Sequence, residues 1–239
     1  MSKASTKMPR SIYQNNGPLS LKQAAEGINA AAANASRLLH DAKILLALGR
    51  YPSAAFLAAI AIEEHGKMAI LDRLAAANKS ELQKLWKEYR SHTAKNTRWI
   101  LPRVADSGPK TLQELLAVFN PNSWHQALFE EIKQLYLYTD FLEEGQWSRP
   151  EEITSKEQAE QIISDASRLI SEKTTTEEEL AQRVSVMKQL KVAGSFAESK
   201  RILAQHLREQ TARDGRQISE DDIENILNGR IDLRGAGRK

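Results

Sequence analysis

Two long segments with helical periodicity follow each other near the N-terminus with almost no linker between them, which constrains the fold more than any other feature. Over residues 20–48, starting from Ser20 as N-cap, apolar side chains recur at every third or fourth position, the spacing of one helix face. Gly49 ends this segment, and Tyr51-Pro52-Ser53 leads into a second helix, expected over residues 54–77 with Ser53 as its N-cap. Helices with so short a joint lie antiparallel. The sequence therefore predicts an αα-hairpin.

The rest of the chain also favours helices. With 11 Gly and 7 Pro among 239 residues, the turn-forming residues fall below the usual background of about 12%, which disfavours turn-rich β architectures. Further helices are expected over residues 80–101, capped by Ser80 and stopped by Pro102, over residues 112–119 and over residues 123–144. We therefore expect an all-α antiparallel bundle with additional C-terminal helices.

The composition also bears on the compartment. Without Cys the chain can form neither disulfides nor thiolate metal sites. The basic N-terminus is not followed by the apolar segment of a secretory signal. The longest apolar run, Ala54–Ile62, has about half the length of a membrane span. These features predict a cytoplasmic protein that does not bind a membrane.

Three parts are expected along the chain. Residues 1–18 are polar and without periodicity, which predicts a flexible arm. Residues 19–150 form the bundle. The chain then becomes more polar, and residues 151–239 are expected to form a helical extension that ends in a frayed tail, with helices over 155–171, 176–192, 195–211 and 219–227. We interpret this extension as a partner-binding or dimerising appendage, with a flexible regulatory tail as the alternative.

Charge is unevenly distributed although the formal net charge is only +3. Residues 84–103 carry six basic side chains and one acidic side chain, whereas residues 140–179 carry twelve acidic and four basic side chains. Cations interleaved with aromatic rings are typical of surfaces that bind single-stranded RNA. The candidates for such contacts are Lys87, Arg90, Arg98 and Trp99. The alternative is a solvated basic face with Trp99 in the core.

The second helix carries Glu63-Glu64-His65-Gly66-Lys67. Both carboxylates have apolar neighbours three and four positions away, so they emerge from an apolar face. A buried charge needs a partner because its desolvation costs several kcal/mol. A structural ion pair that locks this helix to its neighbours is one interpretation, and a functional site is the other. Gly66 inside a helix indicates close approach of a backbone or a ligand.

Several blocks in order resemble the AbiV family of phage abortive-infection proteins, a branch of the HEPN superfamily. The similarity covers residues from about 25 to 152. The blocks are Asn34-Ala-Ser-Arg37-Leu-Leu-His-Asp41-Ala, Gly49-Arg-Tyr-Pro, Glu63-Glu64-His-Gly66-Lys67, Ser91-His92-x-x-Lys95, and Lys133-Gln-Leu-Tyr136-Leu-Tyr138-Thr-Asp140 with Trp147 and Pro150 after it.

The resemblance implies an all-α bundle, frequently dimeric, that defends against phage by arresting growth or protein synthesis. Many HEPN relatives are metal-independent ribonucleases in which an Arg precedes a His by four to six intervening residues. The match to that spacing, Arg201 and His206, lies outside the similar region, and chance alone produces such a match in a chain of this composition.

We therefore place the candidate chemistry in a polar cleft formed by Glu63, Glu64, Lys67, His92 and Lys95. Metal-independent RNA cleavage needs a base for the 2′-hydroxyl proton and cations for the developing phosphate charge. His92 is the candidate acid or base, Lys95 and Lys67 would stabilise the phosphate, and Glu63 and Glu64 would orient the cations. No cofactor or metal is expected, because Glu-x-x-His and His-Glu-x-x-His are absent.

Two further hypotheses complete the interpretation. The alternative to a ribonuclease is a non-catalytic module that inhibits translation by sequestering a component or that responds to a phage protein. In either case we expect a homodimer, with RNA or the translation machinery as target and a phage-encoded activator as a further partner. A structural polar layer is expected around the carboxylates, formed by Asn34, Arg37, Asp41, Tyr136 and Asp140.

Overall fold

The structure is a computed structural model that describes residues 16–108, 110–118, 120, 123–142, 145–171, 173–213, 215, 217–228 and 230–231. It is dominated by helices, which confirms the all-α prediction. Most of the expected N-terminal arm (residues 1–15) and the final residues 232–239 of the expected frayed tail lie outside the described residues.

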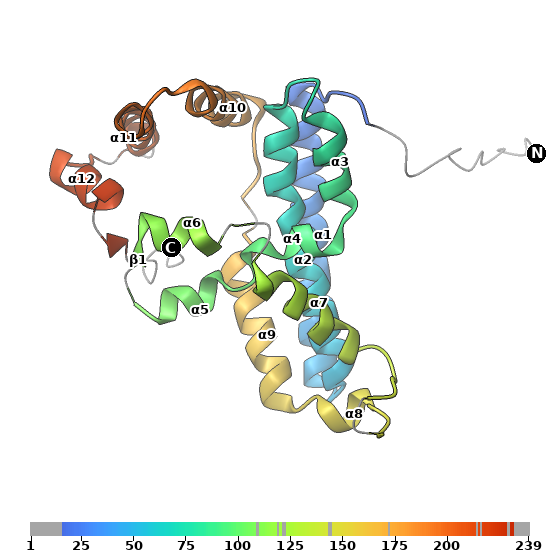
Figure 1. The fold of residues 1–239 in the computed structure, drawn as a ribbon. Coiled ribbons are helices and arrows are strands. Elements are labelled where there is room, and N and C mark those ends of the chain that lie inside the picture. Colours follow the sequence, from blue (N-terminus) through green and yellow to red (C-terminus); the bar gives the residue numbers. More distant parts are fainter. Residues whose placement is uncertain are drawn as a thin grey trace, which may run out of the picture.

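Helices α1 (Leu21–Ala47) and α2 (Tyr51–Ala75) form the predicted antiparallel hairpin along the length of the bundle (Figure 1). The Ser20 side chain caps α1 in a capping box with Gln23, as expected from the sequence. The connection turns at Gly49, whose φ of 71° favours glycine. The expected cap at Ser53 is wrong: α2 already begins at Tyr51, with Pro52 in its first turn, so Ser53 lies inside the helix.

The bundle extends beyond the boundary that we expected near residue 150. Helix α9 (Lys156–Leu169) packs against α1 and α2, and it buries Ala159, Ile162 and Ala166 in the same core as Ala42 and Ala58. This packing shields the apolar face of α9 from water. The packing therefore does not divide the chain at residue 150.

The helix expected over residues 80–101 is broken into short pieces. These are α3 (Leu82–Arg90), α4 (His92–Lys95) and the 3-10 turn η1 (Asn96–Arg98), and α5 (Leu101–Asp106) follows. Ser91 is extended (ψ 129°), and its hydroxyl caps α4 by accepting a hydrogen bond from the Ala94 N–H at 3.3 Å. The expected cap at Ser80 and stop at Pro102 are wrong: Glu81 precedes α3, and Pro102 lies in the first turn of α5, a position that proline favours.

The next segment folds into α6 (Leu112–Val118), α7 (Trp124–Leu135) and the short α8 (Pro150–Ile153). Helix α7 ends at Leu135 instead of near residue 144. Beyond it, Phe141 and Trp147 pair in an isolated antiparallel bridge, with Gly145 at positive φ between them. Tyr138 and Phe141, which the expected helix would have included, therefore lie beyond α7.

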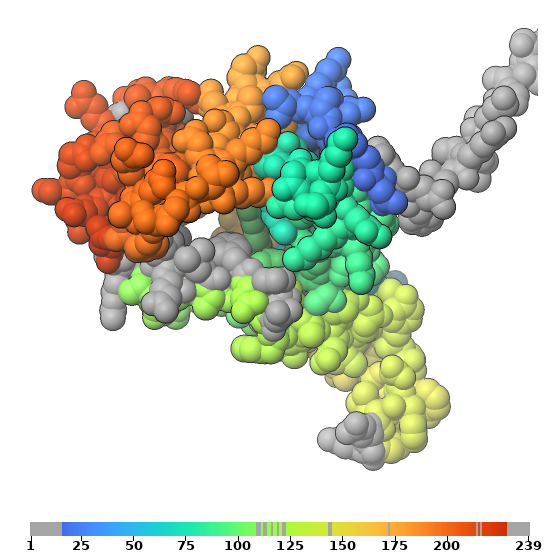
Figure 2. All heavy atoms as spheres, turned by 45° about the horizontal axis from the view of Figure 1, so that its top comes forward, coloured from blue at the N-terminus to red at the C-terminus, as the bar shows by residue number. Residues whose placement is uncertain are grey.

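The C-terminal helices are α10 (Glu177–Val192), α11 (Phe196–Arg213) and α12 (Glu220–Asn228). Helix α10 packs Leu180 and Val184 into a second core with α1, α2 and α3, whereas α11 and α12 share a small core of their own. Figures 1 and 2 show these helices as an arc on one side of the bundle. The arc returns to it through an antiparallel pairing of β1 (Lys110–Thr111) with β2 (Arg230–Ile231). None of the helices in the described residues is long and apolar enough to span a membrane.

Candidate functional site

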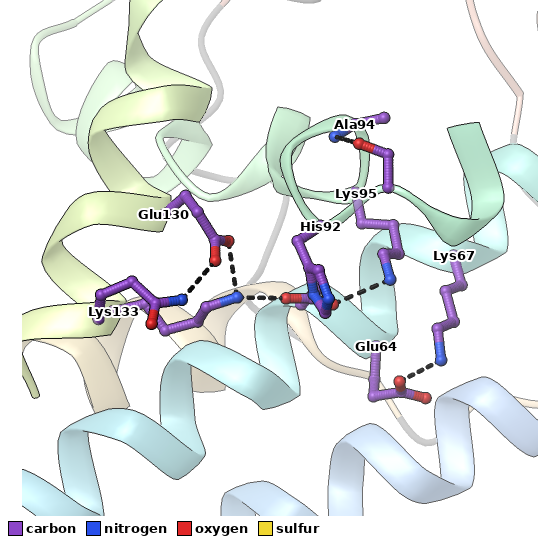
Figure 3. A network of polar contacts seen from close by, with 10 residues as sticks. Glu64, Lys67, His92, Ala94, Lys95, Glu130 and Lys133 are labelled. Carbon is purple, nitrogen blue, oxygen red and sulfur yellow. Dashed lines mark hydrogen bonds and ion pairs between the residues drawn. The ribbon is translucent and has the colours of Figure 1, made fainter. Parts of the chain in front are cut away.

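A network of charged side chains centres on Glu63 of α2, which is 4% exposed. Its Oε1 lies 2.9 Å from Lys95 Nζ and 2.8 Å from His92 Nδ1, and its Oε2 accepts a hydrogen bond from Lys133 Nζ at 2.7 Å. Lys133 Nζ also lies 2.7 Å from Glu130 Oε2. We call these five residues, Glu63, His92, Lys95, Glu130 and Lys133, the Glu63 cluster (Figure 3). It joins α2, α4 and α7.

Local sequence explains how these side chains meet. The break at Ser91 starts α4, and His92 and Lys95 then share one face because they lie three positions apart. Glu130 and Lys133 share a face of α7 for the same reason. The remaining requirement is close approach between α4 and α2, and it is met at Gly66.

Gly66 packs against the backbone of Lys95. A Cβ at this position would overlap the Lys95 carbonyl oxygen and would lie 2.8 Å from its carbon. The sequence indicated close approach of a backbone or a ligand here, and the structure places a backbone.

Burial and ion pairing act in opposite directions on the Glu63 cluster. Burial raises the pKa of Glu63, but hydrogen bonds and charge attraction from Lys133 and Lys95 outweigh it and hold this pKa below its usual value. Burial lowers the pKa of Lys133, but Glu130 and Glu63 raise it above its usual value. Glu63 and Lys133 therefore stay ionised at neutral pH as a buried, paired set of charges.

His92 differs from the lysines in its access to solvent. Lys95 and Lys133 are 5% and 3% exposed, so their ammonium groups face the carboxylates and not a ligand in solution. The His92 side chain is 65% exposed. Because an ionised carboxylate only accepts hydrogen bonds, Nδ1 of His92 donates to Glu63. In the neutral form of the ring, Nε2 is then the acceptor. An oriented, accessible imidazole of this kind can transfer protons.

The same cluster contains a possible set of metal ligands. Ligand atoms of Glu63, His92 and Glu130 lie within 4.8 Å of one another. However, Lys133 already provides positive charge between Glu63 and Glu130, and Lys95 provides a second positive charge at Glu63. A metal ion at this position would have to displace a buried ammonium group, so the donor set fits an ion-pair cluster better than a metal site.

Glu64 and Lys67 lie outside the Glu63 cluster. They form a separate, partly exposed ion pair with each other, and Figure 3 shows it apart from Glu130 and Lys133. Lys67 Nζ also lies 5.7 Å from the centre of the Tyr89 ring. The structure thus brings three of the five predicted catalytic residues together, Glu63, His92 and Lys95.

The predicted RNA contacts are scattered. Lys87 is exposed, and Arg90 is exposed over the Trp86 ring. Arg98 is half-buried, and burial lowers its pKa, opposed by the charge of Asp72 and reinforced by that of Arg183. Trp99 is unsuited to base stacking because it is buried.

The stacking partner of Trp99 is another core ring. Its ring stacks on Phe129 with 4.7 Å between centroids, and its Nε1 donates to the His125 carbonyl at 2.9 Å. This position agrees with the alternative interpretation, in which Trp99 belongs to the core and does not contact RNA.

The predicted structural polar layer does not form. Arg37 contacts Asn34 and Asp41 in an exposed chain along α1, because residues three and four positions apart pair locally. Tyr136 lines a separate cavity with Arg103. Asp140 is exposed, and its side chain accepts a hydrogen bond from the N–H of the next residue, Phe141.

Sequence reasoning missed Glu130 and Lys133 as members of the cluster. Their three-residue spacing is an available signal, because it allows one pair on a helix to present both charges to a neighbouring helix. The Arg201 and His206 pair does not converge, since the two residues line different cavities.

Comparison with known protein families confirms the resemblance seen in the sequence. The sequence model of the AbiV family, in the HEPN class, matches residues 23–171. This region includes α9, in agreement with its place in the bundle core. No curated protein and no solved structure was found to match the chain.

Proposed function

Because the chain belongs to the AbiV family of HEPN proteins, we propose that it is an anti-phage abortive-infection protein that arrests infected cells by acting on RNA or on the translation machinery. The proposal places it in the cytoplasm as a homodimer that responds to a phage-encoded activator. Exposed Tyr138, Phe141 and Trp147 offer apolar surface for a second copy to cover.

The observation that carries the RNA-directed proposal is the exposed His92 ring held by the buried Glu63 carboxylate. His92 Nε2 would take the 2′-hydroxyl proton of a bound RNA, and Glu63 would fix the orientation of the ring. Lys95 and Lys133 would act only through Glu63, as positioning residues, because both are buried against it.

Cleavage of RNA by the purified full-length chain tests this proposal. Total cellular RNA and tRNA are incubated with the protein in EDTA, with and without lysate from phage-infected cells as the source of activator. Defined products should form, and His92→Ala should abolish them without lowering the Tm, because His92 is exposed. His40→Ala, at an exposed position of α1, is the matched control and should cleave normally.

A non-catalytic module is the second candidate, and a specific observation favours it. Both ammonium groups of the Glu63 cluster are buried and paired, as in a clamp that holds α2, α4 and α7 together. This version predicts inhibition of a cell-free translation reaction while the RNA stays intact, with His92→Ala as inhibitory as the wild-type protein. Intact RNA and unimpaired translation, in the presence of the activator, would exclude both candidates.

A further inference from the structure

A polar cavity of about 360 Å³ lies between the bundle and the C-terminal helices, outside the Glu63 cluster. Its walls come from α2, from the connection between α9 and α10, and from α10 and α11 themselves. This volume is in the range of pockets that hold a small molecule.

The cavity is lined by more cationic than anionic side chains. Lys173, Arg183 and Arg213 face one described carboxylate, Glu179, which is occupied by Lys173 at 3.3 Å. Arg183 donates to Asp72 through Nε and Nη2, at 3.2 and 3.0 Å, which leaves its Nη1 available. Within the described part of the chain, Arg213 has no ion pair or hydrogen-bonded side-chain partner. Two guanidinium groups therefore have donors left for an anion.

Two histidines line the cavity from opposite elements, His65 from α2 and His206 from α11. His65 is 8% exposed, and its Nδ1 is buried without a hydrogen-bond partner. A buried polar atom without a partner destabilises the protein, so a ligand that supplies this hydrogen bond gains affinity. Burial, together with the charge of Arg98, lowers the pKa of His65 to about 4, so the ring is neutral at pH 7.

The surroundings of His206 show that the arginines converge. Burial lowers its pKa, Glu209 opposes this shift, and Arg213 and Arg183 lower the pKa further. Positive charge from α10 and α11 thus acts on His206 in the wall of the cavity, which also contains the amides of Gln182 and Gln210. Guanidinium groups match phosphate oxygens, and amides offer both donors and acceptors to a heterocyclic base.

We propose that this cavity binds a nucleotide-sized phosphate monoester, with Arg183 and Arg213 on the phosphate and His65 on the ligand body. The ligand would bridge α2 and α11, and so stabilise the extension against the bundle. This inference does not depend on His92 or on RNA cleavage.

Calorimetric titration of the full-length chain tests the proposal. The probes are each of the four ribonucleoside 5′-monophosphates, the matching nucleosides, and an RNA decanucleotide with a 5′-hydroxyl. At least one monophosphate should bind and raise the Tm, and its nucleoside should bind at least about tenfold more weakly. Arg213→Ala should weaken the binding of that monophosphate by about tenfold or more. It should not change the Tm of the free protein, because Arg213 is exposed.

Arg201→Ala is the matched control, since Arg201 is exposed on the same helix and lies outside this cavity. It should bind the monophosphate normally, and so should His92→Ala. The proposal is overturned if no monophosphate binds, if nucleosides bind equally well, if Arg213→Ala has no effect, or if the RNA binds more tightly than every monophosphate.

Discussion

The backbone of Lys95 lies directly against Gly66, so close that a Cβ on Gly66 would lie 3.2 Å from the Lys95 Cα and would overlap the carbonyl oxygen. This contact sets the distance between α2 and α4. It thereby brings the Lys95 ammonium group to Glu63, three residues before Gly66 on the same helix. The glycine and the ion pair are two parts of one packing arrangement.

Gly66→Ala should therefore destabilise the protein, although alanine favours helices by about 1 kcal/mol over glycine. The added methyl group meets backbone atoms, which cannot rotate away as a side chain can. We expect a net loss of about 1–3 kcal/mol in urea unfolding. Gly27→Ala is the control, because its Cβ would meet only the two side-chain methyl groups of Leu71, at 3.4 and 3.6 Å. This substitution should be neutral or stabilising. Equal effects of the two substitutions would contradict this account of Gly66.

Glu63→Gln should lower the free energy of unfolding more than Gly66→Ala does. Among the described contacts, it removes the only negative charge that pairs with Lys95 and one of the two that pair with Lys133. Removing one partner of a buried pair costs about 3–5 kcal/mol. Glu64→Gln breaks a partly exposed pair and should cost about 1 kcal/mol or less. Chemical denaturation at pH 7 compares the two, and a Glu63→Gln variant as stable as Glu64→Gln would show that the cluster does not hold the helices together.

The stability difference between wild type and Glu63→Gln should also depend on pH. The pKa of Glu63 in the folded protein is held below its ordinary 4.5. The stabilisation is present above pH 4.5 and is lost as the pH falls through the folded pKa. Unfolding curves recorded from pH 6 downward should show the two proteins converging below pH 4.5. A constant difference down to the acid limit would exclude an ionised Glu63 as the source.

Much of the helical architecture could be predicted from local signals. The αα-hairpin follows from periodicity and one short joint. Ser20 caps its helix as expected, and the helices expected from residues 155 and 176 have their N-caps at these residues. Glu63 could be selected because a charge on an apolar face needs a partner. His92 and Lys95 could be selected because RNA cleavage without a metal needs a base and cations. Their meeting on separate elements depends on tertiary packing.

The errors have physical causes. Ser91 can cap a helix or sit inside one, and nothing local decides between these roles, so the break that creates α4 was missed. The sequence alone does not decide whether Trp99 stacks on RNA bases or belongs to the core. Its contact with Phe129, thirty residues later in the chain, decides for the core. Arg37 and Asp41 pair with each other within one helix, so neither needs a partner from another helix to form the polar layer that we expected.

Trp99→Ala should behave as a core deletion and not as the loss of an RNA contact. Trp99 is 3% exposed and stacks on Phe129, and truncating such a ring costs about 3–5 kcal/mol. Trp124→Ala is the matched control, because Trp124 is 72% exposed on α7. Thermal unfolding should show a much lower Tm for Trp99→Ala alone. A Trp99→Ala variant with unchanged Tm and impaired RNA binding would restore the role that the sequence suggested.

His65 should make the folded protein sensitive to mild acid. Its ordinary pKa of 6.5 is lowered to about 4, first by burial and then by the charge of Arg98. The unfolded chain thus takes up a proton near pH 6.5, whereas the folded chain resists it until about pH 4, so stability falls as the pH drops through this window. The loss specific to His65 is on the order of 3 kcal/mol. His65→Gln should flatten the dependence of the unfolding free energy on pH between pH 6.5 and 4, even if the variant is less stable at every pH. His40→Gln is the control, and it should leave this slope unchanged because His40 is exposed. A wild-type slope retained in His65→Gln would assign the acid sensitivity to another group.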